Sequence, residues 1–503
     1  MKTASGLLFC CLLLVNPSRS LGGDMVPEVN IVELPVPNDP TVSFRLWFAV
    51  GSQNDPDGKQ GLANITASML TQASTRKNTY EQILDKLFPL AAGYSGSSTV
   101  EMTILSGRTH QDNLGEYYPL LMDAILRPAF KEEDLDRIKS EALNFLENTL
   151  RYSSDEELGK AVLYNDIFAG TPYGHIPAGT VEGVKSITIE DVKSFYRKHY
   201  TRENVVIGIG GSYDGGTLAR LRRDLWALPE GKSSRVPVPS VAALDGFTVT
   251  VVEKSAPATA ISMGFPVDIV RGGREWYALA IANSWFGEHR NQSSHLFQVI
   301  REARGLNYGD YSYIEHFPGG GRRMKPPQNV CRRQQIFEIW IRPVPTETRH
   351  FTLRAALREF KQLVQNGMTR DDFDLTKSFL KKYALHYAPT TMERLGYALD
   401  DRFYGIDPGH LELFREMMDD ITFEEVNAAV QKFFQFGNMH IVVVTPNAEA
   451  FRGALLRDSL SPITYATPKA ASVLKEDKEI QVFPLKIGPR GVKVVRVEDI
   501  FEK

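Results

Sequence analysis

The chain has 503 residues, of which 43% are hydrophobic and 24% are charged, and its formal net charge is −3. This length predicts two or more domains, and the composition is that of a globular protein and excludes a disordered or fibrous one. The small net charge gives no reason to expect nucleic acid or an anionic membrane as a partner.

The first 20 residues predict a secretory signal peptide. Lys2 precedes the apolar run Gly6–Val15, and Ser18-Arg19-Ser20 follows it, which is the charged, apolar and small-residue order of such signals. The run is too short to span a bilayer, and no later apolar run reaches spanning length. We therefore expect an exported protein, with the periplasm as its compartment.

The three cysteines bear on lipidation and on disulfide formation in an exported protein. Lipidation at Cys10 or Cys11 is the less favoured alternative, because Leu-Leu-Phe before Cys10 lacks small residues. Cys331 is the only cysteine that remains after cleavage of the signal peptide. An internal disulfide is therefore excluded despite the exported context.

Residues 21–228 are predicted to form a first domain. Apolar alternation predicts strands, and apolar residues three and four apart predict helices. The expected strands are 42–50, 98–105 and 205–210, and the expected helices are 61–74, 80–90, 131–150, 155–168 and 188–200.

One helix of this domain carries three short side chains on one face. Asn64, Ala67 and Ser68 lie at i, i+3 and i+4 of the helix that begins near Gly61, so they share one side of it. Their side chains are an amide, a methyl group and a hydroxyl, none of which is a favoured zinc ligand.

Residues 229–246, rich in Pro and Ser, are predicted to be a linker, and residues 247–503 a second domain. Its expected strands are 248–253, 260–265 and 335–342, and its expected helices are 275–286, 351–365 and 370–387.

The second domain repeats parts of the first in the same order and at a near-constant spacing. The matched segments are Glu133–Ser140 with Asp371–Ser378, Leu158-Gly159 with Leu395-Gly396, and Ile187–Val192 with Ile421–Val426. Similar helix caps explain single matches but not their order. The sequence therefore predicts an α+β fold of two homologous domains, each a mostly antiparallel β-sheet with helices packed on one side.

Residues 317–333 have no counterpart in the first domain. The segment is rich in Gly and Pro and carries five basic residues, namely Arg322, Arg323, Lys325, Arg332 and Arg333. The simplest interpretation is a solvated surface insertion, and the alternative is a loop that binds a partner or acidic peptide segments.

These motifs together resemble the pitrilysin/insulinase family of zinc peptidases, which includes mitochondrial processing peptidase. The resemblance extends over essentially the whole mature chain. Its motifs are Gly51–Gly58 before Gly61-Leu62-Ala63, Thr171–His175 with Gly179-Thr180, Ile187–Asn204, and Leu296–Tyr308.

The resemblance implies that the zinc site of the family has been lost. Family members carry His-x-x-Glu-His on the first of these helices, and the ligand positions fall here on Asn64 and Ser68 and the base position on Ala67. A third ligand comes from a downstream helix, where Glu141 fits best. Glu141 alone is not a zinc site, and a solvated helix residue is the simpler interpretation of it. No His-x-x-x-His pair occurs elsewhere, and His175 is expected to fix loop structure.

A second family feature is retained. Active members carry an Arg, and a Tyr seven residues later, that resemble Arg301 and Tyr308. Arg301 is predicted near a helix end that Gly305 terminates, and Tyr308 on the following strand. Both could donate to the oxyanion that develops on a peptide carbonyl during attack by water. An Arg paired with a surface acid and a core Tyr are the alternative.

The resemblance implies one preferred function and two alternatives. We expect a non-catalytic subunit of a heterodimeric exported zinc metallopeptidase, which binds peptides and supplies Arg301 and Tyr308 to a homologous partner carrying His-x-x-Glu-His. Zinc is then expected in the partner and no cofactor in this chain. The first alternative is an inactive homologue acting as a peptide-binding or structural scaffold subunit. The second, an autonomous zinc enzyme with replaced ligands, lacks a ligand cluster in the sequence.

Overall fold

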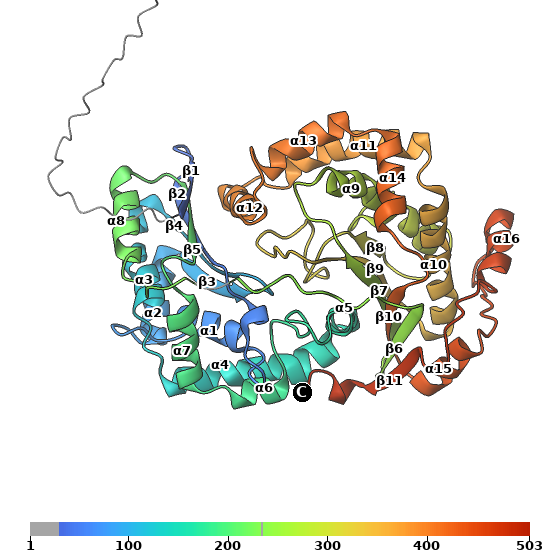
Figure 1. Ribbon diagram of the computed structural model, residues 1–503, viewed down its shortest axis with the longest axis horizontal. Coiled ribbons are helices and arrows are strands. Elements are labelled where there is room, and N and C mark those ends of the chain that lie inside the picture. Colours follow the sequence, from blue (N-terminus) through green and yellow to red (C-terminus); the bar gives the residue numbers. More distant parts are fainter. Residues whose placement is uncertain (1–29, 233–234) are drawn as a thin grey trace, which may run out of the picture.

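The computed structural model describes residues 30–232 and 235–503. The predicted signal peptide, residues 1–20, lies outside the described residues. Two β-sheets, one in each half of the chain, organise the molecule (Figure 1). Within the described ranges, no helix has the length and apolar character needed to cross a membrane.

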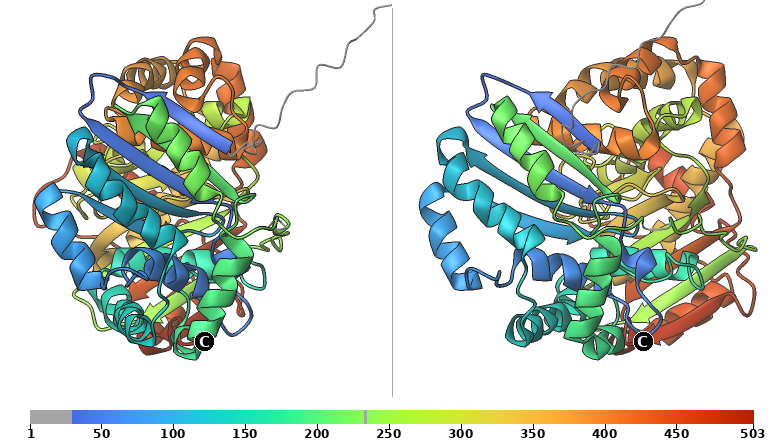
Figure 2. Two further views of the ribbon diagram at one scale, coloured as in Figure 1. Left: turned by 90° about the vertical axis from the view of Figure 1, so that its left-hand side faces the viewer. Right: turned by 60° about the vertical axis from the view of Figure 1, so that its left-hand side comes forward.

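The first sheet has the strand order β1-β5-β2-β4-β3, and only its β1–β5 pair is parallel. Helices α2, α3, α7 and α8 lie along its outer side (Figures 1 and 2). The strands are β1 Asn30–Pro35, β2 Thr41–Phe48, β3 Gly93–Ser98, β4 Thr103–His110 and β5 Val205–Gly211. The helices are α1 Leu62–Thr71, α2 Tyr80–Leu87, α3 Leu114–Leu126, α4 Glu132–Asn144, α5 Asp155–Ile167, α6 Val181–Ser186, α7 Ile189–His199 and α8 Gly215–Leu225.

The second sheet has the order β11-β6-β10-β7-β9-β8, with parallel pairs at β11–β6 and β6–β10. Its strands are β6 Phe247–Glu253, β7 Ala258–Val267, β8 Asp310–Tyr313, β9 Gln335–Pro345, β10 Met439–Thr445 and β11 Val492–Arg496. The helices are α9 Arg274–Gly287, α10 Arg349–Asn366, α11 Arg370–Tyr383, α12 Thr391–Tyr404, α13 His410–Asp420, α14 Phe423–Phe433, α15 Ala448–Leu456 and α16 Ala471–Ile480. The predicted α+β fold is confirmed.

One predicted strand was misplaced. The sequence placed a strand at 98–105, but residues 99–102 form the turn between β3 and β4, which Thr99 closes by donating its N–H to the Met102 carbonyl at 2.8 Å. The predicted helix 131–150 is also divided, because α4 ends at Asn144 and a π-helix continues from Phe145 to Ser153.

The repeated segments occupy equivalent places in the two halves. Thr188 and Thr422 each form a reciprocal capping box at the start of α7 and α14. Lys139 on α4 donates to the carbonyls of Lys185 and Ile187 at 2.9 and 2.7 Å. Lys377 on α11 donates to the carbonyls of Asp419 and Ile421 at 3.0 and 2.7 Å. Equivalent lysines therefore join equivalent pairs of helices in the two halves, which supports the internal duplication.

The two halves exchange one helix each. Helix α5 packs against β7, β9 and β10 of the second sheet, and α12 packs against β1, β2 and β5 of the first (Figure 1). The repeated Leu-Gly pairs lie on these helices. A Cβ at Gly159 would lie 3.3 Å from Ser262 Oγ, and a Cβ at Gly208 would lie 3.0 Å from the Leu395 side chain. Each sheet is therefore covered on its inner face by a helix from the other half.

The interpretation of residues 317–333 as a solvated insertion is wrong for most of the segment. Arg332 is buried with 2% of its surface exposed, and the Arg333 guanidinium binds the buried Glu101 carboxylate of the first half at 2.6 Å. Asn329 binds Arg45 of the first half and Asp400 of α12. Only residues around Gly321–Met324 are exposed. The segment is a bridge between the two halves, because its charged and amide side chains find buried partners on both.

Candidate functional site

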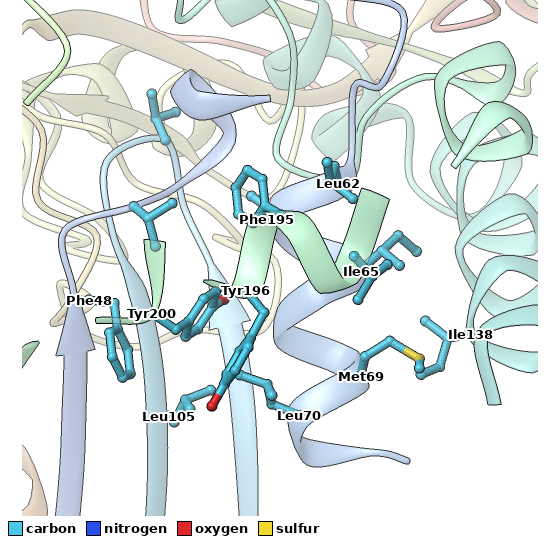
Figure 3. Packing of buried hydrophobic residues seen from close by; sticks show 14 of the residues in the cluster. Phe48, Leu62, Ile65, Met69, Leu70, Leu105, Ile138, Phe195, Tyr196 and Tyr200 are labelled. Atoms are coloured by element: carbon cyan, nitrogen blue, oxygen red, sulfur yellow. The ribbon is translucent and has the colours of Figure 1, made fainter. Parts of the chain in front are cut away.

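Helix α1 is held from several sides. Leu62 and Ile65 lie toward α7, Met69 lies toward Ile138 of α4, and Leu70 lies toward the first sheet (Figure 3). All four α1 side chains are at most 2% exposed. Gly61 starts the helix at φ +105°, and at Gly179 a Cβ would lie 2.2 Å from the Gln60 carbonyl oxygen. Glycine is required at these two positions by the positive φ and by the close approach.

Asp55, which the sequence analysis did not single out, fixes the start of α1. Its carboxylate accepts the N–H groups of Gly61 and Ala63, both at 2.7 Å, and lies 3.0 Å from His175 Nε2. Burial raises the pKa of Asp55, and His175 and the two N–H groups oppose this. His175 therefore orders loops, as expected from the sequence. No local sequence signal marks Asp55, because it lies six residues before Gly61, the N-cap residue of α1.

The three positions on the predicted face of α1 lie on one side of the helix. Ala67 is fully buried, and its carbonyl oxygen would lie 2.9 Å from a Cβ at Gly96 of β3. Asn64 and Ser68 are half-buried, and neither side chain makes a hydrogen bond to another described residue. The amide, the methyl group and the hydroxyl lie side by side but provide neither a strong zinc ligand nor a base.

Glu141 on α4 does not join this group. Its side chain is 56% exposed and accepts a hydrogen bond from Arg137 at 2.9 Å. Arg137 also donates to the carbonyl of Gln72 at the end of α1. In the described ranges no three His, Cys, Asp or Glu side chains cluster as a metal site would require. The residues of α1 and α4 do not fit the zinc ion of the family.

Arg301 and Tyr308 both lie before the start of β8. Arg301 lies on a π-helix, Phe297–Glu302, and its side chain is 38% exposed, with Glu302 Oε1 at 3.2 Å. Tyr308 is 80% exposed. Gly305, at φ +72°, donates its N–H to the Arg301 carbonyl at 2.7 Å. The motif therefore presents both side chains to the surface.

The prediction that Tyr308 lies on a strand is wrong, because β8 begins at Asp310. The Asn307 side chain binds the N–H and carbonyl of Gly309 and forms a bend there. A second Arg of the motif has a structural role that the sequence did not indicate. Arg304 is buried and pairs with Asp477 at 2.9 Å and Glu476 at 3.0 Å on α16.

Each sheet has one edge strand beside these groups. Among the described residues, β3 pairs only with β4 and β8 only with β9, and of these two edge strands β3 is open to solvent whereas β8 is buried. Helix α1 packs on β3, and the Arg301–Tyr308 motif leads into β8. The free edge of a strand offers unpaired N–H and carbonyl groups, to which an extended peptide can add.

Two family models match the chain. The model described as insulinase, peptidase family M16, matches residues 31–180, and the model described as peptidase M16 inactive domain matches residues 186–380. Together they cover well over half of the chain.

Curated relatives have similar lengths. An uncharacterized zinc protease, SCO5738, from Streptomyces coelicolor is 23% identical over 359 residues, which cover 68% of this chain and 72% of the relative. The non-peptidase homolog YmxG from Helicobacter pylori is 22% identical over 436 residues, which cover 83% of this chain and 93% of the relative.

Solved structures share the fold. A peptidase M16 inactive domain from Pseudomonas fluorescens superposes with a TM-score of 0.73 at 24% identity, covering 83% of this chain and 96% of that one. A protease from Helicobacter pylori gives a TM-score of 0.70 at 16% identity, with the same coverage. The duplicated architecture is thus that of the matched family.

Proposed function

Because this chain belongs to the insulinase (M16) peptidase family and has Asn64, Ala67 and Ser68 on α1, we propose that it is the non-catalytic subunit of a two-chain zinc metallopeptidase. The partner is a homologous subunit that carries His-x-x-Glu-His and holds the zinc ion, which activates the attacking water. The pair acts on peptides in the periplasm.

The exposure of Arg301 and Tyr308 is the observation that carries this proposal. Tyr308 is 80% exposed, and the ion pair of Arg301 is to its own neighbour Glu302, with both side chains open to solvent. Such a pair contributes little to stability. A guanidinium and a phenol kept at the surface in this way are available as donors to a carbonyl oxygen of a peptide on the partner's zinc.

The edge strands support the same role in peptide binding. Apart from Tyr94, β3 consists of Gly and Ser, and among the described residues its edge beside α1 is unpaired. An extended peptide that adds to this edge is bound through its main chain and therefore with little dependence on its sequence. Arg301 and Tyr308 then contribute when negative charge develops on the scissile carbonyl.

The test uses the chain purified together with a homologous His-x-x-Glu-His chain and a quenched peptide mixture. Hydrolysis is expected only from the pair and is expected to be abolished by a chelator. Arg301→Ala is expected to lower kcat of the assembled pair by roughly 10²–10³-fold, as for loss of an oxyanion donor. Arg415→Ala, at an exposed arginine of α13, is the matched control and should leave kcat unchanged.

The scaffold alternative also has a specific observation in its favour. Residues 317–333 fasten the halves through Arg333–Glu101 and Asn329–Arg45, and a relative carries the name non-peptidase homolog. If the assembled pair retains full turnover with both Arg301→Ala and Tyr308→Phe, the chain is a structural subunit and the proposed role of these residues is wrong.

A further inference from the structure

A cavity of about 80 Å³ lies in the second half, among α9, α11, α13 and the segment that follows β8. A single water needs roughly 10–15 Å³, so the cavity has room for a small organic group. Figure 1 places these helices in the half opposite to α1. Seven Trp, Tyr and Phe side chains line it, among them Trp276, Tyr313, Phe317, Tyr387, Tyr397 and Phe414.

Glu288 lines this cavity and lacks a cationic partner. It follows the last residue of α9, and the Ser284 hydroxyl donates to its carboxylate. No Lys, Arg or His among the described residues forms an ion pair with it. Burial among aromatic rings raises the pKa of Glu288 to about 7. The carboxylate is therefore costly to ionise unless a cation enters.

Arg271, the cation that lines the cavity, is already neutralised. It binds Glu315 through Nε and Nη2, with Nη2 at 2.6 Å, and Asp400 through Nη1 at 3.2 Å. Two carboxylates thus face one guanidinium. The Glu288 carboxylate therefore has no cationic partner in this cluster. Glu288 also lies at the C-terminal end of α9, where the helix dipole favours a cation.

The histidines and tyrosines that line the cavity keep their charge state between pH 6 and 8. Burial lowers the pKa of His289 to about 4 and holds that of His410 well below its usual value. Burial and the nearby Glu288 charge raise the pKa of the Tyr383 and Tyr387 phenols. Burial also raises the pKa values of the Tyr313 and Tyr397 phenols. Glu288 is the lining carboxyl group whose raised pKa falls in this range.

The aromatic cluster already accommodates one ammonium group. Lys160 Nζ lies 4.5 Å from the centre of the Tyr313 ring, which also lines the cavity. Aromatic faces attract cations, and the attraction grows when the cation is desolvated. An aromatic wall with one unpaired carboxylate suits a compact ammonium on an apolar stem. A guanidinium, with five donors, would leave several of them unpaired.

We propose that this cavity binds an alkylammonium group, with the ammonium on the Glu288 carboxylate and the methylene stem along the aromatic wall. The ligand is either a lysine side chain of a peptide or a free diamine, since both present the same chemistry. This site goes beyond the proposed role of Arg301 and Tyr308 and does not depend on a zinc-bearing partner.

Titration calorimetry of the full-length chain tests the proposal with two probes, cadaverine and Nα-acetyl-lysine methylamide, and with 1-pentanol as the uncharged control. At least one amine is expected to bind with one-to-one stoichiometry, and 1-pentanol is not. Affinity should fall about tenfold from pH 8 to pH 6, because only the ionised carboxylate binds. Preference for the lysine derivative identifies a peptide side chain as the ligand, and preference for cadaverine a free amine.

The variant Glu288→Gln should lose at least about tenfold in affinity at pH 8, because it removes the charge that pairs with the ammonium. Glu416→Gln, at an exposed glutamate of α13, is the matched control and should bind like the wild type. Absence of binding by both amines, or equal binding by Glu288→Gln and wild type, overturns the proposal. A thermal melt of each variant verifies that it is folded.

Discussion

At the residue scale, Asp55 and the α1 side chains show why a helix can persist after its chemistry has gone. Asp55 binds two N–H groups of α1 and His175, and the apolar side chains of the helix lie in the core of the first half. None of these contacts involves the side chains of Asn64 or Ser68. The residues at the metal-ligand positions are therefore not the residues that hold α1 in place. The ligands can be lost while the helix keeps its position.

Glu288 gives a pH prediction at this scale. Its folded-state pKa of about 7 lies above the ordinary value of 4.5, so the folded state retains a proton that the unfolded chain releases. The wild type should lose stability as pH rises from 4.5 through 7, relative to Glu288→Gln, which cannot ionise. In ligand-free protein the variant should be more stable by about 3 kcal/mol at pH 8 and by under about 1 kcal/mol at pH 5.

Urea denaturation of both proteins at pH 5 and pH 8 measures this difference. Glu416→Gln should follow the wild type at both values, since its carboxylate is exposed. A stability difference between wild type and Glu288→Gln that is constant with pH would mean that Glu288 ionises with an ordinary pKa.

At the element scale, Lys139 and Lys377 connect equivalent helices in the two halves. Each ammonium binds two carbonyls at or just beyond the end of a helix, α6 in the first half and α13 in the second. Carbonyls at helix ends lack partners within the helix and carry the negative end of its dipole. The repeated lysine is therefore a C-terminal cap from a neighbouring helix.

Replacing either lysine by methionine keeps the apolar stem and removes the cap. Each single variant should lose about 1 kcal/mol of unfolding free energy, and the double variant about the sum, because the two sites share no partner. Thermal unfolding compares them with Lys382→Met, at an exposed lysine of α11, which should be neutral. A single variant that matches Lys382→Met would show that its two carbonyls are satisfied by water.

The sequence predicts elements where periodicity and caps are strong. Helix α5 was predicted at 155–168 and is found at Asp155–Ile167, with Ser154 as its N-cap. Strand β3 was missed because Gly93–Ser98 has no apolar alternation and forms a strand only by pairing with β4. A π-helix after Asn144 was also missed, since its side-chain pattern does not differ enough from that of an α-helix.

Only those parts of the candidate site that lie within continuous segments of the sequence could be predicted. The positions of Asn64, Ala67, Ser68, Arg301 and Tyr308 follow from motifs in continuous segments. Contacts such as Asp55 with His175, or Arg304 with Asp477, join residues more than a hundred positions apart. Such pairs depend on tertiary packing, which a single sequence does not specify.

At the scale of the whole molecule, the segment 317–333 fixes the two halves to each other. Arg333 and Glu101 form its clearest contact, because the Glu101 side chain is 1% exposed and would be left as a buried charge without Arg333. Tyr173 also donates to Glu101 but carries no charge to balance it. Removing one partner of such a pair is more costly than the pair is favourable.

Arg333→Ala should therefore lower the unfolding free energy by about 3–5 kcal/mol and increase proteolytic cleavage between the halves. Arg322→Ala is the matched control, since Arg322 lies in the same segment and is exposed. Thermal unfolding and limited proteolysis compare the two variants. Equal behaviour would mean that the segment lies on the surface of both halves without holding them together.

The last residues of the chain complete the first half. Val181 donates its N–H to the Phe501 carbonyl at 2.9 Å, and the buried Arg151 donates to the Ile500 carbonyl at 2.6 Å. At roughly 5–20 residues per second, a ribosome needs on the order of a quarter of a minute to a minute to proceed from residue 181 to residue 501. During translation the first half thus cannot complete its packing until residues 500 and 501 have been added.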